Sequence, residues 1–261
     1  MGKNERFRRS QLATFTAWCS LACLLAACDG SGERPKASSD GELSPETPTA
    51  ATPAAGPAGA LTGRVTFAQA DLPVTEPFNV NIDQTFCAGK VVNETLVINP
   101  ESKTVKNVVV TINGVKDGKE TPTTVRLANK DCNFEPHVVA AVKGSKLEVT
   151  NDDPVNHTTQ GLLPNRVFMN NSITVGAKPR TKTLRRKGII SMKCDVHKWM
   201  TAWVFVHEND YFAVTDDTGS FSIEDVPPGT YNVKTWHEKL GENEKTVTIE
   251  GGKTTNQDFS F

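Results

Sequence analysis

The sequence predicts an all-β protein, and two observations carry that prediction. Short runs rich in Val, Ile, Thr and Phe alternate apolar with polar residues, and Gly, Asn, Asp or Pro residues bound them. No window sustains the period of about 3.6 residues that marks an amphipathic helix. The runs expected to form strands are residues 63–69, 106–114, 123–129, 137–144, 146–152, 203–209, 211–217, 219–225, 230–236 and 245–252.

Residues 1–27 have the pattern of an export signal. Four basic residues within the first nine positions precede a mostly apolar run from Leu12 to Ala27. The run ends in Leu-Ala-Ala directly before Cys28, which resembles a bacterial lipobox and implies a lipid on Cys28 after cleavage. We therefore expect a lipoprotein of the bacterial cell envelope, held on the membrane by this lipid, with its folded part outside the cytoplasm on the periplasmic side. A plain signal peptide with an unmodified cysteine is the alternative.

Residues 28–60 form the next compositional region. They consist almost wholly of small and polar residues and proline, so they cannot bury enough apolar surface to offset the entropy of ordering. We expect a disordered tether here. No later apolar run approaches the roughly 18 residues that a membrane-spanning helix needs.

The charge balance argues against a nucleic-acid partner. The chain has 29 Lys and Arg against 30 Asp and Glu, and without residues 1–27 it keeps 25 against 29, a net charge of −4. No strongly basic domain is left that would attract a phosphate backbone.

Six cysteines are present, of which two fall within residues 1–27 and one is Cys28. The remaining three are Cys87, Cys132 and Cys194, an odd number in an oxidising compartment where thiols tend to pair. The simplest partition joins Cys87 to Cys132 in a disulfide and reserves Cys194 for a metal.

The last fifty residues contain a set of turn and strand residues, namely Thr215-Asp216, Gly219, Phe221, Ile223, Val226-Pro227-Pro228-Gly229 and Tyr231. With this set they resemble the carboxypeptidase-regulatory-like, transthyretin-like β-sandwich. Gly219 is expected to form a hairpin turn, and Pro227-Pro228-Gly229 a bend before the next strand. Such sandwiches open with a Gly-x-Val strand, which this chain supplies far upstream at residues 63–65. We therefore expect residues 61–121 and 209–261 to form one sandwich into which residues 122–208 are inserted. Three consecutive β regions are the alternative.

One group of residues carries metal-ligand chemistry. His157 follows the expected strand 146–152, while Cys194, His197 and Met200 stand three residues apart from one another. Two imidazoles, a thiolate and a thioether form the donor set of a blue-copper site. The spacing therefore predicts that the two loops meet at one end of a β structure.

These residues and the flanking segments resemble a cupredoxin of the plastocyanin and amicyanin type, over about residues 122–208. Related sequences carry names from methylamine utilisation. The resemblance implies a Greek-key barrel, and His157, Cys194, His197 and Met200 as ligands of one type 1 copper ion. It also implies that the His197 edge, with Trp199 and Trp203 near it, is where electrons enter and leave.

The flanking residues depart from this family at two places. Thr158 stands where an asparagine commonly ties the ligand loops together, with Asn156 on the other side of His157, and Lys198 replaces a common proline. These changes affect the surroundings of the ligands, which tune metal affinity and potential. Met192 is expected to pack in the core.

Three further histidines stand apart from the ligand group. His137 is expected to be structural or exposed, with an auxiliary ligand role as the alternative. His207 and His237 lie outside the ligand constellation.

The expected function is electron transfer by a membrane-tethered copper protein, with a cytochrome or a periplasmic oxidoreductase as the redox partner. No Ser-His-Asp order or phosphate-binding loop is present, so we expect no enzyme activity. The alternatives are a copper-binding or copper-delivery protein, and a metal-free adhesive or carbohydrate-binding module of the envelope.

Overall fold

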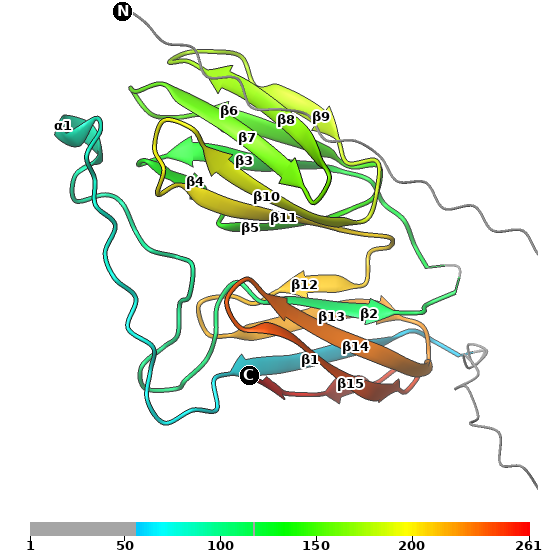
Figure 1. Ribbon diagram of the computed structural model, residues 1–261. Helices are drawn as coiled ribbons and strands as arrows, with labels where there is room; N and C mark the ends of the chain where they lie inside the picture. Colours follow the sequence, from blue (N-terminus) through cyan, green and yellow to red (C-terminus); the bar gives the residue numbers. More distant parts are fainter. Residues whose placement is uncertain (1–55, 117) are drawn as a thin grey trace, which may run out of the picture. The chain divides into compact units, whose positions relative to one another are not determined.

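The computed structural model describes residues 56–116 and 118–261, and their regular structure is almost entirely β (Figure 1). The expected signal, most of the expected tether, and Cys28 lie outside the described residues. In the described residues, no helix is long and apolar enough to be a membrane span. The first six strands are β1 (Gly59–Thr66), β2 (Val109–Asn113), β3 (Thr124–Lys130), β4 (Asn133–Glu135), β5 (Val138–Val142) and β6 (Lys146–Asn151). The others are β7 (His157–Leu163), β8 (Arg166–Ile173), β9 (Arg180–Thr183), β10 (Gly188–Cys194), β11 (Thr201–His207), β12 (Phe212–Val214), β13 (Ser220–Val226), β14 (Gly229–His237), β15 (Gly241–Ile249), β16 (Thr254–Asn256) and β17 (Phe259–Ser260).

The first two and the last six strands form one pair of sheets. One sheet has the order β13-β1-β16, with β17 also pairing with β1, and the other has the order β12-β2-β14-β15. Strands near the start of the described chain therefore hydrogen-bond with strands near its end, β1 with β13 and β2 with β14. Their inward-facing side chains share a core that includes Leu61, Val65, Val110, Ile112, Phe221, Ile223, Val233, Ile249 and Phe259.

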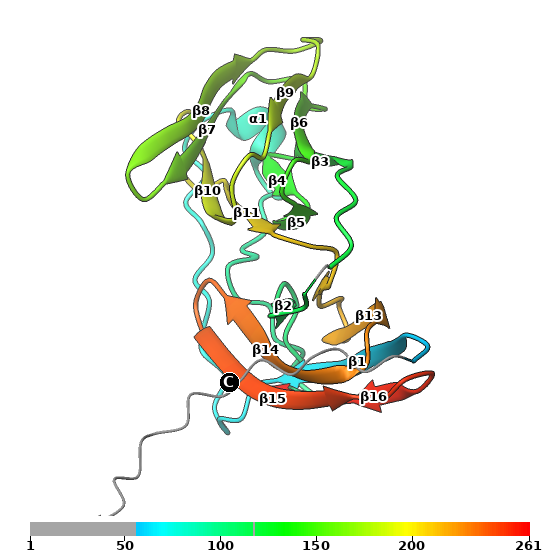
Figure 2. The ribbon, with the colours of Figure 1, turned by 90° about the vertical axis from the view of Figure 1, so that its right-hand side faces the viewer.

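The strands between them form a second pair of sheets. A five-stranded sheet has the order β5-β11-β10-β7-β8, and a four-stranded sheet has the order β4-β3-β6-β9. Figure 2 shows the two as separate layers. The expected all-β fold class is confirmed, and the two sheets do not close into a barrel, because the edge strands β8 and β9 each pair with only one strand. The side chains buried between the layers include Leu127, Phe134, Leu147, Val149, Ile173, Met192, Ala202 and Val204.

Strand β10 shows how the sequence positions the candidate ligands. Ile190, Met192 and Cys194 are buried, while Lys193 is exposed. This period of two follows from the alternating directions of side chains along a strand. The alternation directs Cys194 towards the core. Met192 has no exposed surface and packs in the core, as expected.

Gly219 adopts a left-handed backbone conformation, with φ of 68°. A Cβ atom at this position would lie 2.6 Å from the Cβ of Thr104 and 2.8 Å from the carbonyl oxygen of Val65, so only glycine fits. The turn is not the expected hairpin, because β12 and β13 belong to different sheets and do not pair. It carries the chain from one layer to the other.

Between β1 and β2 the described chain forms no further named strand. It forms a long irregular segment that contains the helix α1 (Gln84–Cys87), and Figure 1 shows this segment in cyan and teal. Isolated bridges join Thr66 to Thr104 and Ile98 to Val105. The sequence pattern likewise predicted no strand between residues 69 and 106.

Candidate metal centre

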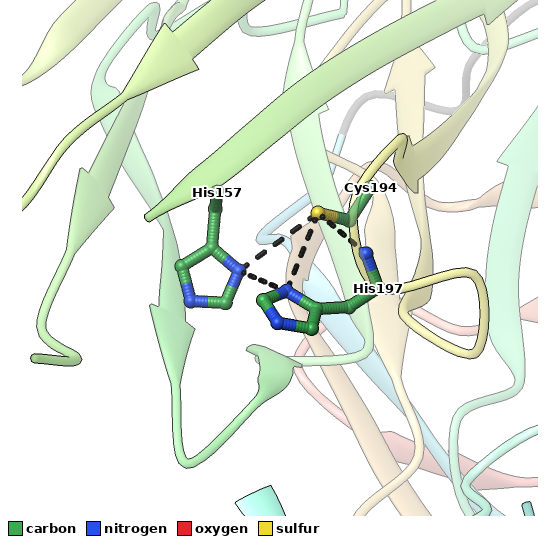
Figure 3. Close-up of side chains that lie close together, drawn as sticks. All are labelled: His157, Cys194 and His197. Carbon is green, nitrogen blue, oxygen red and sulfur yellow. Dashed lines mark hydrogen bonds between the residues drawn. The ribbon is translucent and has the colours of Figure 1, made fainter. Parts of the chain in front are cut away.

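Three ligand-type side chains converge at one end of the five-stranded sheet. His157 is the first residue of β7, Cys194 is the last residue of β10, and His197 lies in the loop between β10 and β11. Because β7 and β10 are antiparallel neighbours with Cys194 opposite Thr159, the start of one and the end of the other meet. Figure 3 shows both imidazoles and the sulfur directed at one another. His157 and His197 have no exposed surface, and Cys194 is 2% exposed.

The spacing of the three donor atoms fits one metal ion. The two Nδ1 atoms are 3.0 Å apart, and the Cys194 sulfur lies 3.8 Å from each of them. The point equidistant from these three atoms is about 2.1 Å from each, close to the roughly 2.0–2.3 Å usual for imidazole and thiolate ligands of a metal such as zinc. A soft thiolate with two imidazoles suits copper better than a hard cation. No second His, Cys, Asp and Glu group of this kind occurs among the described residues.

The remaining nitrogen of each imidazole contacts a carboxylate. His157 Nε2 lies 2.9 Å from Asp153 Oδ2, and His197 Nε2 lies 3.0 Å from Asp83 Oδ2. An ionised carboxylate only accepts hydrogen bonds, so each Nε2 carries the hydrogen and donates it. The neutral rings then present an unprotonated Nδ1 to the centre, which is the tautomer that metal binding requires.

Asp153 is held by the turn between β3 and β4. Its carboxylate accepts hydrogen bonds from the backbone N–H groups of Asp131 and Cys132, at 2.6 and 2.9 Å. Both residues have left-handed backbone angles, with φ of 50° and 58°, so their N–H groups form a small anion cradle. Burial raises the pKa of Asp153, but the bonds from His157 and the two N–H groups outweigh it and lower the pKa.

Replacing Asp153 with asparagine is expected to weaken both the fold and the site. The amide has one acceptor oxygen for three donors, so a buried donor is left unpaired at a cost of about 1–3 kcal/mol in the metal-free protein. Loss of a carboxylate behind a ligand histidine typically weakens metal affinity by about 10–100-fold. Chemical denaturation and a competitive metal titration measure the two effects.

The neighbouring residue provides the matched control for this change. Asp152 is exposed and pairs with Arg126 at 2.7 Å, away from the ligands. Asp152→Asn is expected to cost less than about 1 kcal/mol and to leave metal affinity unchanged. Equal effects of the two substitutions would contradict the role given to Asp153.

The surroundings of Cys194 favour the thiolate form of its side chain. Burial raises the pKa of this thiol, but its contacts with the His157 ring, with the backbone N–H groups of His197 and Thr158, and with the His197 ring lower it to about 6. Burial also lowers the pKa of His157, yet its contacts with Asp153 and Cys194 raise it overall. At neutral pH the metal-free site therefore holds a thiolate beside a readily protonated imidazole.

Backbone bonds connect the two ligand loops. The Asp195 N–H donates to the Thr158 carbonyl at 2.9 Å, so residue 158 links the loops without an asparagine side chain. The Asn156 side chain accepts from the Val175 N–H at 3.0 Å instead. Met200 closes the second loop, since its N–H donates to the His197 carbonyl at 2.9 Å and its carbonyl accepts from the Cys194 N–H at 3.2 Å.

The His197 edge, where electrons are expected to enter and leave, is covered in the structure. The His197 side chain is 0% exposed, and Trp199 beside it is only 6% exposed. Asp83 and Cys87, from the segment between β1 and β2, contact the His197 ring. The second tryptophan, Trp203, lies against Trp236 of β14 instead.

The structure contains the disulfide between Cys87 and Cys132, the pair expected from the sequence. Cys194 is the free cysteine among the described residues.

The carboxylates that contact the two histidines, Asp153 and Asp83, were not predicted from the sequence. Asp153 stands four residues before His157, a spacing that offered a signal, whereas Asp83 stands 114 residues from His197 and offered none.

The other histidines do not join the centre. His137 is buried and hydrogen-bonds the carboxylate of Glu238. His207 contacts the backbone of Asn209 through Nδ1, and burial lowers its pKa. Burial also lowers the pKa of His237 to about 4.

Comparison with known proteins matches parts of the chain. A family model for domain II of polysaccharide lyase family 4 matches residues 182–257. No curated protein gives a significant match. A purple cupredoxin from Nitrosopumilus maritimus is 20% identical over 32% of this chain and 99% of its own, with a TM-score of 0.29. Amicyanin from Paracoccus versutus is 17% identical over 38% and 97%, with a TM-score of 0.29. A copper-containing nitrite reductase from Thermus scotoductus is 18% identical over 37% and 25%, with a TM-score of 0.31.

Proposed function

We propose that this protein is a type 1 copper protein that carries single electrons in the bacterial cell envelope. The observation that supports it best is the convergence of two Nδ1 atoms and one thiol sulfur in a buried triangle. His157, Cys194 and His197 would hold one copper ion, with the Met200 thioether as a weak fourth ligand. One-electron oxidation and reduction is the chemistry that a copper ion supplies in such a donor set.

The protein's own residues keep the ligands in place during that chemistry. Asp153 and Asp83 orient the two imidazoles, and the backbone bonds between the ligand loops limit their movement. The ligand side chains are almost fully buried, so water and substrates are kept from them. A site with fixed ligands and no access for a substrate suits electron transfer rather than catalysis, and we propose no enzyme activity.

The remaining parts of the proposal concern location and partners. A lipid on Cys28 would hold the protein on the membrane and raise its effective concentration near a cytochrome or a periplasmic oxidoreductase.

We also propose that residues 122–208 are a domain inserted into a sandwich made by residues 61–121 and 209–261. The pairing of β1 and β2 with β12 to β17 supports this division.

The experiment that tests the function is reversible redox cycling. The protein is loaded with one equivalent of Cu(II), reduced with ascorbate and reoxidised with ferricyanide while the visible band is followed. An electron carrier loses and regains the whole band over many cycles without releasing copper. Copper release on each reduction would instead favour the alternative of a copper-delivery protein.

Replacing Met200 with leucine tests the proposed thioether ligand. Leucine keeps the volume of the buried side chain but removes the thioether, so the visible band is expected to remain. The reduction potential is expected to rise, because the lost donor stabilises Cu(II) more than Cu(I). Met192→Leu on β10 is the matched control and should leave the potential unchanged; protein-film voltammetry measures both.

Copper affinity is expected to fall as the pH falls. The His157 pKa is raised above its ordinary 6.5 and the Cys194 thiol pKa is about 6, so copper must displace protons from this pair below neutral pH. Each displaced proton lowers the apparent affinity by about tenfold per pH unit. A competitive Cu(II) titration between about pH 5 and 8, corrected for protonation of the competitor, measures the slope. A flat profile would contradict this pair as ligands.

A further inference from the structure

Residues 76–93 lie beside the candidate metal centre, and we name them the cover segment. They lie within the irregular connection between β1 and β2 and include α1. The ends of the cover segment are joined, because the Asn93 side-chain amide donates to the Glu76 carbonyl at 2.8 Å. The segment is therefore a closed loop with its own internal bonds, such as that from the Gln84 side chain to the Val80 carbonyl at 2.9 Å.

The cover segment is attached to the sheets that carry the ligands in three ways. The Cys87–Cys132 disulfide joins α1 to the turn between β3 and β4. The Asn133 side chain accepts from the Val92 N–H at 3.1 Å and donates to the Lys90 carbonyl at 3.2 Å. Apolar side chains of the segment also pack on the core between these sheets, namely Phe78, Val80, Phe86 and Val91.

The attached segment closes the side of the centre at His197. Asp83 Oδ2 accepts from His197 Nε2 at 3.0 Å, and the Cys87 sulfur lies 4.0 Å from the same nitrogen. Asp83 precedes α1 with a left-handed φ of 47°, and its side chain makes no capping bond to the helix. Its carbonyl accepts from the Phe86 and Cys87 N–H groups instead, so the carboxylate is left for the imidazole.

Cys132 connects the cover segment to the rest of the centre. Its sulfur bonds to Cys87, its N–H donates to Asp153 at 2.9 Å, and its carbonyl accepts from Trp199 Nε1 at 3.0 Å. Asp153 in turn contacts His157. One residue of a tight turn thus links the disulfide to the groups that surround both ligand histidines.

We propose that the cover segment is a permanent part of the metal centre, and that Asp83 is the positioning residue for His197. Asp83 fixes the plane of the His197 ring with Nδ1 directed inward, and the disulfide keeps Asp83 in place. A redox partner then meets the outside of the cover segment rather than a bare histidine edge. The consequence for electron transfer rests on the proposed function, whereas the protection of His197 does not depend on any metal.

The test uses the metal-free full chain and diethyl pyrocarbonate, which modifies accessible neutral imidazoles. Peptide mass mapping gives the rate of modification at each histidine. His157 and His197 are both expected to be protected. In Asp83→Ala the rate at His197 is expected to rise by about 10–100-fold, the change that corresponds to losing one charge-assisted hydrogen bond. The rate at His157 should stay low.

Two further variants separate positioning from a loss of folding. Asp83→Asn keeps an oxygen that can accept from Nε2, so it is expected to restore much of the protection. Asp71→Ala changes an exposed carboxylate in the same connection and is expected to behave as wild type. The Nε2–H signal of His197 in ¹⁵N-edited NMR spectra should be present in wild type and absent in Asp83→Ala, with unchanged circular dichroism.

The outcomes are decisive in both directions. Rapid modification of His197 in wild type, or equal rates in wild type and Asp83→Ala, would overturn the proposal. The role of the disulfide is tested by hydrogen exchange before and after its reduction with a phosphine. Reduction should increase the exchange rates of the backbone amides of residues 76–93. Unchanged exchange rates would remove the disulfide from the proposal. Protection of His197 without a copper–thiolate band would reject the electron-carrier function alone.

Discussion

Replacing Cys194 with serine is expected to abolish the visible charge-transfer band of the Cu(II)-loaded protein completely. The band arises from electron transfer between a thiolate and Cu(II), and Cys194 supplies the only sulfur in the triangle of donor atoms. A serine hydroxyl keeps its proton at neutral pH and is a harder, weaker ligand for copper. Copper affinity is expected to fall together with the band.

The effect of this substitution is measured by a Cu(II) titration followed by absorbance. Ser191→Ala provides the matched control, because Ser191 lies three residues earlier on β10 but is absent from the cluster. The control should develop the full band at one equivalent of copper. A band of wild-type intensity in Cys194→Ser would mean that the copper–thiolate bond forms elsewhere.

Removing the Cys87–Cys132 disulfide is expected to cause a large loss of stability. The two cysteines are separated by 45 residues, and restraint of a loop of that length in the unfolded chain is worth about 4 kcal/mol. Both side chains are fully buried, so serine hydroxyls in their place add a cost of desolvation. Cys87→Ser/Cys132→Ser should therefore lower the free energy of unfolding by about 4 kcal/mol or more.

This loss is measured by denaturant unfolding of the metal-free protein, since a bound metal would stabilise the native state by mass action. Phosphine reduction of the wild-type protein gives an independent value without any substitution. A loss below about 1 kcal/mol in both experiments would show that the disulfide contributes little to the fold.

The sequence predicted that His157, Cys194 and His197 come together, and the structure brings their donor atoms into one cluster. The alternation along β10 directs Cys194 inward, and the three-residue spacing to His197 lets a tight loop return the imidazole to the same point. His157 could be placed because a strand ends shortly before it and β7 begins with it. These relations are local, so periodicity and spacing reveal them.

The surroundings of His197 could not be predicted in the same way. Asp83 belongs to a segment with no strand or helix period, and its contact with His197 spans 114 residues. Whether the two sheets join into a closed barrel could not be predicted either, because alternation along a strand does not say whether two edge strands will pair. Such features depend on long-range packing, which one sequence does not encode in its local pattern.

The measurement that tests the copper centre most directly is X-ray absorption at the copper edge of the protein loaded with one equivalent of Cu(II). The proposed site predicts one sulfur and two imidazole nitrogens in the innermost shell, with the sulfur lost in Cys194→Ser. An innermost shell of nitrogen and oxygen alone, unchanged by that substitution, would contradict copper binding by His157, Cys194 and His197.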